Sequence, residues 1–84
     1  MDNPIKQATE RSAEYRERER THRRAARNWG ECADRETSRH AWQVYDMLAR
    51  TQDNVADECK QASLSFDLLA AEMTDEADAA RSAT

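Results

Sequence analysis

The sequence predicts an all-α protein, an antiparallel helical hairpin in which two helices lie side by side. One reason is composition, since the 84 residues include one glycine and one proline and 36% of them are charged. Such a mixture suits exposed or oligomeric helices and disfavours β-sheets. A second reason is periodicity, because apolar residues recur at steps of three and four, which is the period of one helix face. A short polar connector interrupts this pattern once, so two helices are expected.

The first helix is expected over residues 4–29. Asp2 or Asn3 can cap it, and Pro4 suits the first helical position, where no backbone N–H is needed. Gly30 is the only glycine, and it follows Trp29 where a helix commonly ends in a left-handed residue. One face of this helix carries a regularly spaced stripe that is apolar only at its ends and is therefore expected to be a poor core face. It consists of Ile5, Ala8, Ser12, Tyr15, Glu19, His22, Ala26 and Trp29.

The second helix is expected over residues 38–73, with Thr37 or Ser38 as its cap. A break near Asp53 and Asn54 is an alternative, since either residue can start a new helix, but one long helix is favoured. Residues 74–84 are rich in acidic residues and alanine and are expected to be a frayed or disordered tail, outside a single helical domain of residues 1–73. The stripe of this helix has near-heptad spacing and consists of Ala41, Val44, Leu48, Gln52, Val55, Cys59, Ala62, Phe66, Leu69 and Met73.

This stripe needs more cover than the first helix can supply. Leu, Ile, Val and Phe make up only about a tenth of the chain, well below the ~20% under which a sequence begins to resemble a disordered one. Large apolar groups on the first helix are limited to Ile5, Tyr15 and Trp29. A second copy of the chain is the simplest cover, so we expect a dimeric helical bundle of coiled-coil type. The expected oligomer or partner interface consists of Val44, Leu48, Val55, Cys59, Phe66, Leu69 and Met73.

Two further groups of residues are candidates for contact with a partner. Trp29, Trp42 and Tyr45 lie near the connector and either pack the closed end of the hairpin or form a binding hot spot. A basic ridge on the first helix is a candidate contact with nucleic acid or an acidic partner. Interleaved glutamates and the acidic second half of the chain offer the alternative, a salt-bridged face exposed to water. The ridge consists of Arg16, Arg20, Arg23, Arg24 and Arg27.

Catalytic and metal-binding patterns are weak. Cys32 and Cys59 form no CxxC motif, and in the hairpin they lie about 33 Å apart, too far for a disulfide bond. Glu19 and His22 form one Glu-x-x-His fragment, half of what a metal-binding bundle uses, among arginines that oppose a cation. No glycine-rich loop or nucleophile turn is present in the sequence. We therefore expect no enzyme activity, no cofactor and no metal.

The sequence favours a small, non-enzymatic helical interaction protein. It would act as a homo-oligomeric regulator or inhibitor that binds a macromolecular partner, in the manner of a phage or mobile-element accessory protein. The alternative is a nucleic-acid-binding regulator that uses the basic ridge. Expected partners are a second copy of the chain and an unidentified protein, with nucleic acid as the alternative. No apolar run is long enough for a membrane span, so we expect a cytoplasmic protein without membrane contact.

Overall fold

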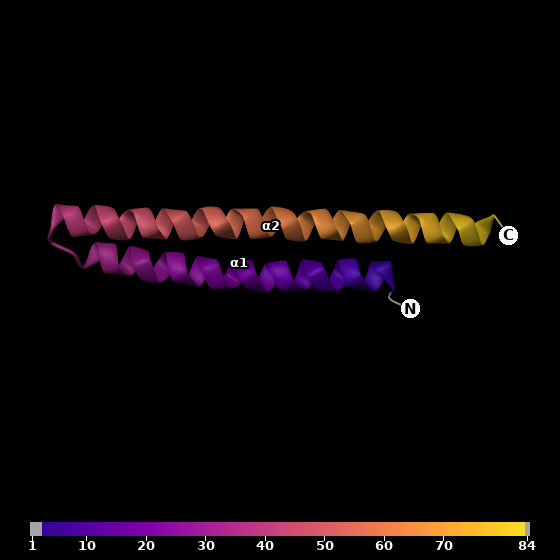
Figure 1. The fold of residues 1–84 in the computed structure, drawn as a ribbon, viewed down its shortest axis with the longest axis horizontal. Coiled ribbons are helices and arrows are strands. Elements are labelled where there is room, and N and C mark those ends of the chain that lie inside the picture. Colours follow the sequence, from indigo (N-terminus) through magenta and orange to yellow (C-terminus); the bar gives the residue numbers. More distant parts are fainter. Residues whose placement is uncertain (1–2, 84) are drawn as a thin grey trace.

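The computed structural model describes residues 3–83 and places them in two antiparallel helices, α1 (Pro4–Asp34) and α2 (Arg39–Ser82) (Figure 1). The all-helical hairpin predicted from the sequence is confirmed at this level. The molecule is a rod with extents of 70 × 18 × 14 Å. Its length follows from α2, because 44 helical residues at about 1.5 Å each span nearly the whole long axis.

Both helices begin at side-chain caps that the sequence predicts. The Asn3 side chain accepts hydrogen bonds from the backbone N–H groups of Ile5 and Lys6, at 3.0 and 3.3 Å. The Ser38 hydroxyl accepts one from the N–H of Ala41 at 3.4 Å. These bonds satisfy donors that have no partner inside the helix, which is why asparagine and serine start helices.

The expected end of the first helix at residue 29 is wrong. Gly30 lies inside α1, which continues to Asp34, and no residue within 3–83 has a positive φ. A glycine in a helix interior costs only about 1 kcal/mol relative to alanine, so a helix can continue past Gly30 if its next turn makes packing contacts. That turn does make them, because its residue Ala33 is buried against α2. The connector is therefore shorter than expected.

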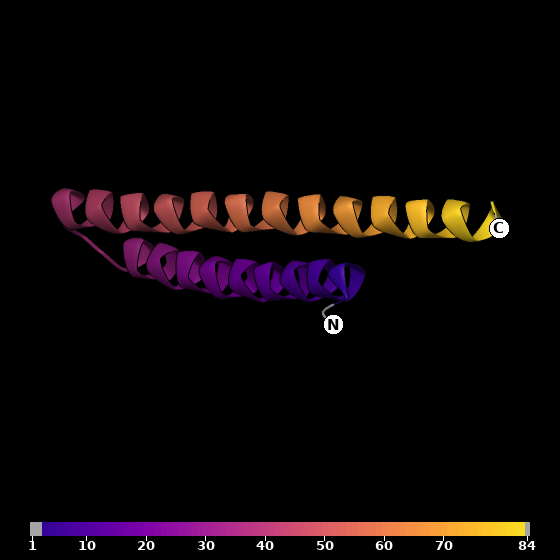
Figure 2. The same cartoon turned by 45° about the vertical axis from the view of Figure 1, so that its right-hand side comes forward.

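The second helix also ends later than residue 73. α2 runs without a break through Asp53 and Asn54 and continues to Ser82. Asp53 does not cap a new helix, and its carboxylate instead accepts a hydrogen bond from Arg23 at 3.3 Å. Residues 74–82 contain alanine and glutamate, which favour helix without needing a buried face. This exposed end of α2 extends past the N-terminus of α1 (Figures 1 and 2).

The seam between the helices is lined by small residues. Every residue of the stripe on the first helix is buried or half-buried, so this face contacts α2, although its polar middle makes it look like a poor core face in the sequence. Small side chains let two helix backbones approach closely, and they leave the large side chains at the edges of the seam. The largest fully buried side chain in the described part of the chain is Ser12. The buried residues are Ala8, Ser12, Ala26, Ala33, Ala56, Cys59 and Ser63.

Candidate interaction surfaces

The hairpin has two unlike flanks, one on each side of the seam. Successive residues of a helix turn by about 100°, so positions on α2 can be placed relative to Cys59 at the seam. Carboxylates and the arginines that bind them lie on one side, here called the charged flank: Arg16, Arg23, Asp53, Asp57 and Asp67. Apolar residues of α2 lie on the other side, here called the apolar flank: Val44, Leu48, Val55, Ala62, Leu69 and Met73.

A ring of hydrogen bonds joins the helices on the charged flank. Ser12 Oγ donates to Asp67 Oδ1 at 2.5 Å and lies 2.9 Å from Ser63 Oγ. Because Ser12 has a single hydroxyl proton, Ser63 must donate to Ser12. Arg16 completes the ring, since its Nε donates to Ser63 Oγ at 3.2 Å and its Nη2 donates to Asp67 Oδ2 at 2.6 Å. The bonds from Ser12 and Arg16 lower the pKa of the Asp67 carboxyl below its ordinary value.

This ring has a structural role. A serine beside an aspartate is a pattern found in nucleophilic sites, but Ser12 is only 1% exposed and lies in the seam. No substrate can reach a hydroxyl that is covered on all sides by the two helices. The sequence placed Ser12 on the contact face but offered no signal for its partners, which lie on α2 more than fifty residues away.

The arginines of the basic ridge fall into two groups, those that bind α2 and those that face water. Arg16 belongs to the ring, and Arg23 donates to Asp57 at 2.7 Å, to Glu19 at 3.2 Å and to Asp53 at 3.3 Å. These bonds raise the pKa of Arg23, with Asp57 as the main cause. Two of the five arginines predicted as a contact surface therefore hold α1 to α2.

The other three arginines of the ridge face water. Arg20 donates to Glu17 at 2.6 and 3.1 Å, and this bond lowers the pKa of the exposed Glu17 carboxyl. Arg24 and Arg27 make no hydrogen bond or ion pair to any residue within 3–83. Together with Arg20 and Arg23 they line a shallow depression of about 360 Å³. The basic surface left for a partner is smaller than the sequence suggests.

The Glu-x-x-His fragment is used within the hairpin. His22 Nδ1 lies 2.7 Å from Gln52 Oε1 across the seam, and Glu19 accepts a hydrogen bond from Arg23. No group of three potential metal ligands gathers anywhere in residues 3–83. Cys59 is buried in the seam and Cys32 is half-buried near the connector, and both thiols are free.

Two of the three aromatic hot-spot candidates pack against each other. The rings of Trp29 and Tyr45 stack with centroids 5.7 Å apart and join the helices near the connector. Trp42 remains 42% exposed. Farther along the hairpin, Tyr15 stacks on Phe66 at 5.8 Å, although the sequence gives no pairing between these two residues. The closed end of the hairpin is therefore a packing site, with Trp42 as its exposed neighbour.

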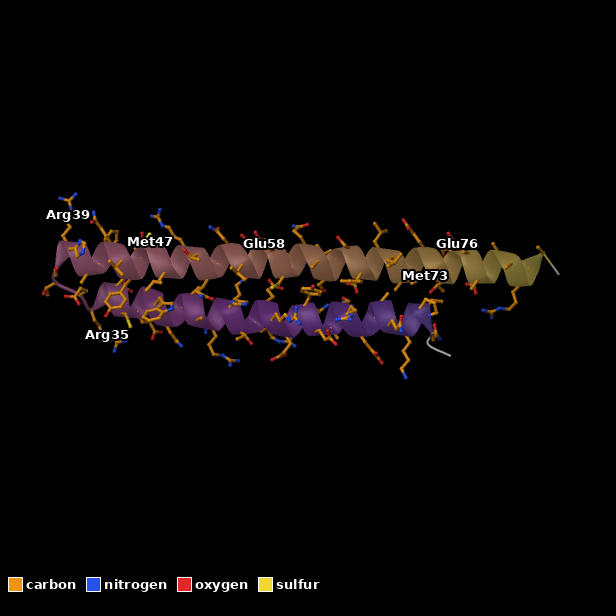
Figure 3. The ribbon with its side chains drawn as sticks, in the orientation of Figure 1. Arg35, Arg39, Met47, Glu58, Met73 and Glu76 are labelled. Atoms are coloured by element: carbon orange, nitrogen blue, oxygen red, sulfur yellow. The ribbon has the colours of Figure 1, made fainter. Side chains whose placement is uncertain are left out.

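The apolar flank of α2 is only partly covered by α1. Val44 is 38% exposed and Leu69 is 44% exposed, and the other residues of this flank are half-buried. Near the N-terminus of α1, where Met73 lies (Figure 3), an open groove of about 540 Å³ separates the helices. Its walls include Phe66, Leu69 and Met73 from α2 and Gln7, Arg11 and Glu14 from α1.

The outer face of α2, away from α1, carries large apolar residues that the predicted interface did not include. Leu64 is 51% exposed, and Leu68 and Met47 are each 61% exposed. Leu64 and Leu68 are four residues apart and so lie on the same face of the helix. The sequence shows that these two leucines share a helix face, but it does not show that this face lies away from the seam.

Comparisons with models of protein families, with curated protein sequences and with solved structures find no match to this chain. Within the described residues, neither helix has an apolar stretch of the length that a bilayer crossing requires.

Proposed function

We propose that the protein is a non-enzymatic helical interaction protein, a homo-oligomeric regulator or inhibitor that acts by occupying a surface on a macromolecular partner. One observation carries this proposal. The buried apolar residues of the described chain are four alanines and Cys59, while the leucines, valines and large aromatic residues all keep part of their surface in water. A hairpin of this kind has apolar surface to contribute to association and little internal core.

The energetics support association. Full burial of a leucine or valine side chain stabilises a protein by about 1.5–3 kcal/mol, and residues that stay half-exposed realise only part of this. Ordering each residue of a hairpin costs about 1–2 kcal/mol of conformational entropy. Covering the apolar flank with another surface offsets more of that cost, so folding and association are expected to be coupled. The outer pair of leucines stays available for a different partner.

The experiment that tests the proposal is solution molar mass by light scattering after size exclusion, with circular dichroism on the same peak. We expect a strongly helical species with the mass of a dimer or a larger assembly. Dilution should lower the mass and the helical signal together, because the same contacts serve folding and association. A helical, stable monomer that stays monomeric at high concentration would contradict the proposal.

A second candidate function is nucleic-acid binding through the exposed part of the basic ridge. The observation that favours it is that Arg24 and Arg27 lie three residues apart on α1 and their side chains make no hydrogen bond within 3–83, with Glu17 as the one carboxylate on which the charge of Arg24 acts. Binding to a short DNA duplex would then weaken steeply as salt is raised, because phosphate contacts release counterions. The double substitution Arg24→Glu and Arg27→Glu should abolish that binding, whereas Arg39→Glu, at the start of α2, should leave it unchanged. Equal binding by both variants would exclude this function.

A further inference from the structure

The arginines of the shallow depression on the basic ridge are balanced by the carboxylates that bind them. The depression is lined by four arginines, which are Arg20, Arg23, Arg24 and Arg27. Four carboxylates accept hydrogen bonds from these arginines, and they belong to Glu17, Glu19, Asp53 and Asp57. Attraction of a polyanion depends on an excess of positive charge. In the closed hairpin this group of eight side chains has no such excess.

The two helices contribute different halves of the balancing charge. Glu17 and Glu19 belong to α1 and pair with arginines three or four residues along the same helix, so they stay beside the depression wherever α2 lies. Asp53 and Asp57 belong to α2 and reach Arg23 because the hairpin is closed. Without these two aspartates, the arginines of the depression would exceed their carboxylates by two charges.

Arg23 is shared between α2 and the depression. Its side chain is 36% exposed, so a ligand in water can reach it. Both of its terminal nitrogens are already bonded, because Nη1 donates to Asp53 at 3.3 Å and Nη2 donates to Asp57 at 2.7 Å and to Glu19 at 3.2 Å. A phosphate group that pairs with a guanidinium uses these same N–H donors. Carboxylate and phosphate therefore cannot both take the bonds that Arg23 makes here.

Building on the second candidate function, nucleic-acid binding, we infer that α2 inhibits the basic depression from within the chain. Asp53 and Asp57 compete with a phosphate group of the nucleic acid for Arg23, and a bound nucleic acid displaces them. The competition is reciprocal, so a nucleic acid in the depression weakens this contact between α1 and α2. The ring that contains Arg16 and Asp67 lies about two helical turns away and keeps the helices paired when Arg23 is released.

Substitution of the two aspartates tests the competition. The asparagine pair, Asp53→Asn with Asp57→Asn, removes both negative charges of α2 and keeps the size of the side chains. We expect it to bind a short DNA duplex about tenfold more tightly than the unmodified protein, as measured by fluorescence anisotropy at fixed salt. A plot of log affinity against log salt concentration should steepen by about one, because one further phosphate contact forms.

A matched control changes the overall charge by the same amount without releasing Arg23. Asp75→Asn with Glu76→Gln removes two negative charges from the exposed end of α2. These side chains are far from the depression and screened by salt, so we expect duplex binding to change by less than about twofold. Equal tightening by the control and by the asparagine pair would overturn the inference, because overall charge would then explain the gain.

Substitution of Arg23 separates competition from a general effect of local charge. Arg23 is occupied in the unmodified protein, so Arg23→Gln should weaken duplex binding there by less than about twofold. In the asparagine pair Arg23 is released, and Arg23→Gln should remove most of the gain. Arg24→Gln is the control, since Arg24 binds neither aspartate, and it should weaken binding by the same factor in both backgrounds. An equal factor for Arg23→Gln in the two backgrounds would overturn the inference.

Circular dichroism and molar mass show whether each variant keeps the hairpin. If the asparagine pair loses the helical signal, Asp57→Asn alone takes its place, with Asp75→Asn as the control. That single change removes the shortest of the three bonds to Arg23 and should tighten duplex binding about threefold.

The outcomes separate the inferred inhibition from the candidate function. Duplex binding of equal strength by the unmodified protein and the asparagine pair would overturn the inhibition and leave nucleic-acid binding standing. Binding by the asparagine pair alone would mean that α2 inhibits the depression fully. No binding by either protein would exclude the candidate function and the inference together.

Discussion

The two flanks of this hairpin differ in what they contribute to the molecule. The charged flank holds the helices together through the Ser12–Asp67 contact and the ion pairs of Arg16 and Arg23. These contacts form only when the two helices are aligned so that the paired residues lie side by side. The apolar flank carries no ion pair between α1 and α2 within residues 3–83, and it leaves large side chains in contact with water. Polar contacts therefore set the alignment of the helices, while the apolar flank supplies surface for association.

Polar contacts are needed to set the alignment of the two helices, because small residues in the seam can pack at more than one alignment. Ala26 and Ala33 of α1 are one heptad apart, as are Ala49, Ala56 and Ser63 of α2, so a shift of one heptad would again bring small residues together in this part of the seam. The ring that joins Ser12, Ser63, Asp67 and Arg16 forms at only one alignment, since it needs both serines level with each other. A shifted hairpin would leave these polar groups without partners, at a cost of about 1–3 kcal/mol for each that is buried.

The largest expected effect comes from a charge on the apolar flank. Leu48→Asp should weaken self-association by about 100-fold, near 3 kcal/mol, because the dimer buries a carboxylate without a partner. The helical signal should fall with the molar mass, and both are measured on the same size-exclusion peak. Leu68→Asp on the outer face is the matched control and should change neither. Equal effects of the two variants would show that the two faces do not differ.

A smaller loss is expected on the charged flank. Ser12→Ala removes the buried hydroxyl between Ser63 and Asp67, and we expect the free energy of unfolding to fall by about 1–2 kcal/mol. Urea unfolding followed by circular dichroism measures this. The control is Ser65→Ala, whose exposed hydroxyl bonds only to its own helix at Gln61 O. If both variants unfold alike, the ring contributes nothing to stability.

The charged flank should also make stability depend on pH. The pKa of Asp67 is lowered in the folded protein, so its contribution is fully present above the unfolded value of about 3.9. That contribution is lost as the pH falls through the lower folded pKa. We expect the unmodified protein to lose more stability than Asp67→Asn between neutral and strongly acid solution. Asp75→Asn on the exposed end of α2 should follow the unmodified protein, and the same behaviour from both variants would contradict this prediction.

A change that touches neither flank provides a reference. Gly30 lies inside α1 with a negative φ, and a Cβ added there meets nothing within 4 Å. Gly30→Ala should therefore raise the free energy of unfolding by up to about 1 kcal/mol, through helix propensity alone. Thermal unfolding measures the gain, and the oligomeric mass should not change. A loss of stability would mean that α1 does end before this residue.

Much of the local structure was predictable because its causes are local. Asn3 and Ser38 cap helices through hydrogen bonds to residues two or three positions away, so the sequence places each cap to one of two neighbouring residues. The spacing of the α1 stripe follows from helical periodicity, but its polar middle hid the fact that the whole stripe, from Ile5 to Trp29, contacts α2. Gly30 indicates a helix end at residue 29, but α1 continues past it because Ala33 in the next turn is buried.

The candidate surface was predicted only in outline. The apolar stripe of α2 is wider than one neighbouring helix can cover, so its spacing does not tell which members face α1. The structure buries Cys59 in the seam and leaves Leu69 at the edge of the groove, although both belong to the predicted interface. It also leaves two of the five predicted arginine contacts occupied within the hairpin, Arg16 and Arg23.

The sequence by itself determined that this protein is a pair of helices and placed the start of each helix to within one residue. Only the tertiary structure decided how the helices are aligned, that Ser12 meets Asp67, and that charges gather on one flank while apolar residues gather on the other. The reason is the range of the interactions. Caps and periodicity act within a few turns, whereas alignment depends on side chains that are far apart in the sequence and meet only when the hairpin closes.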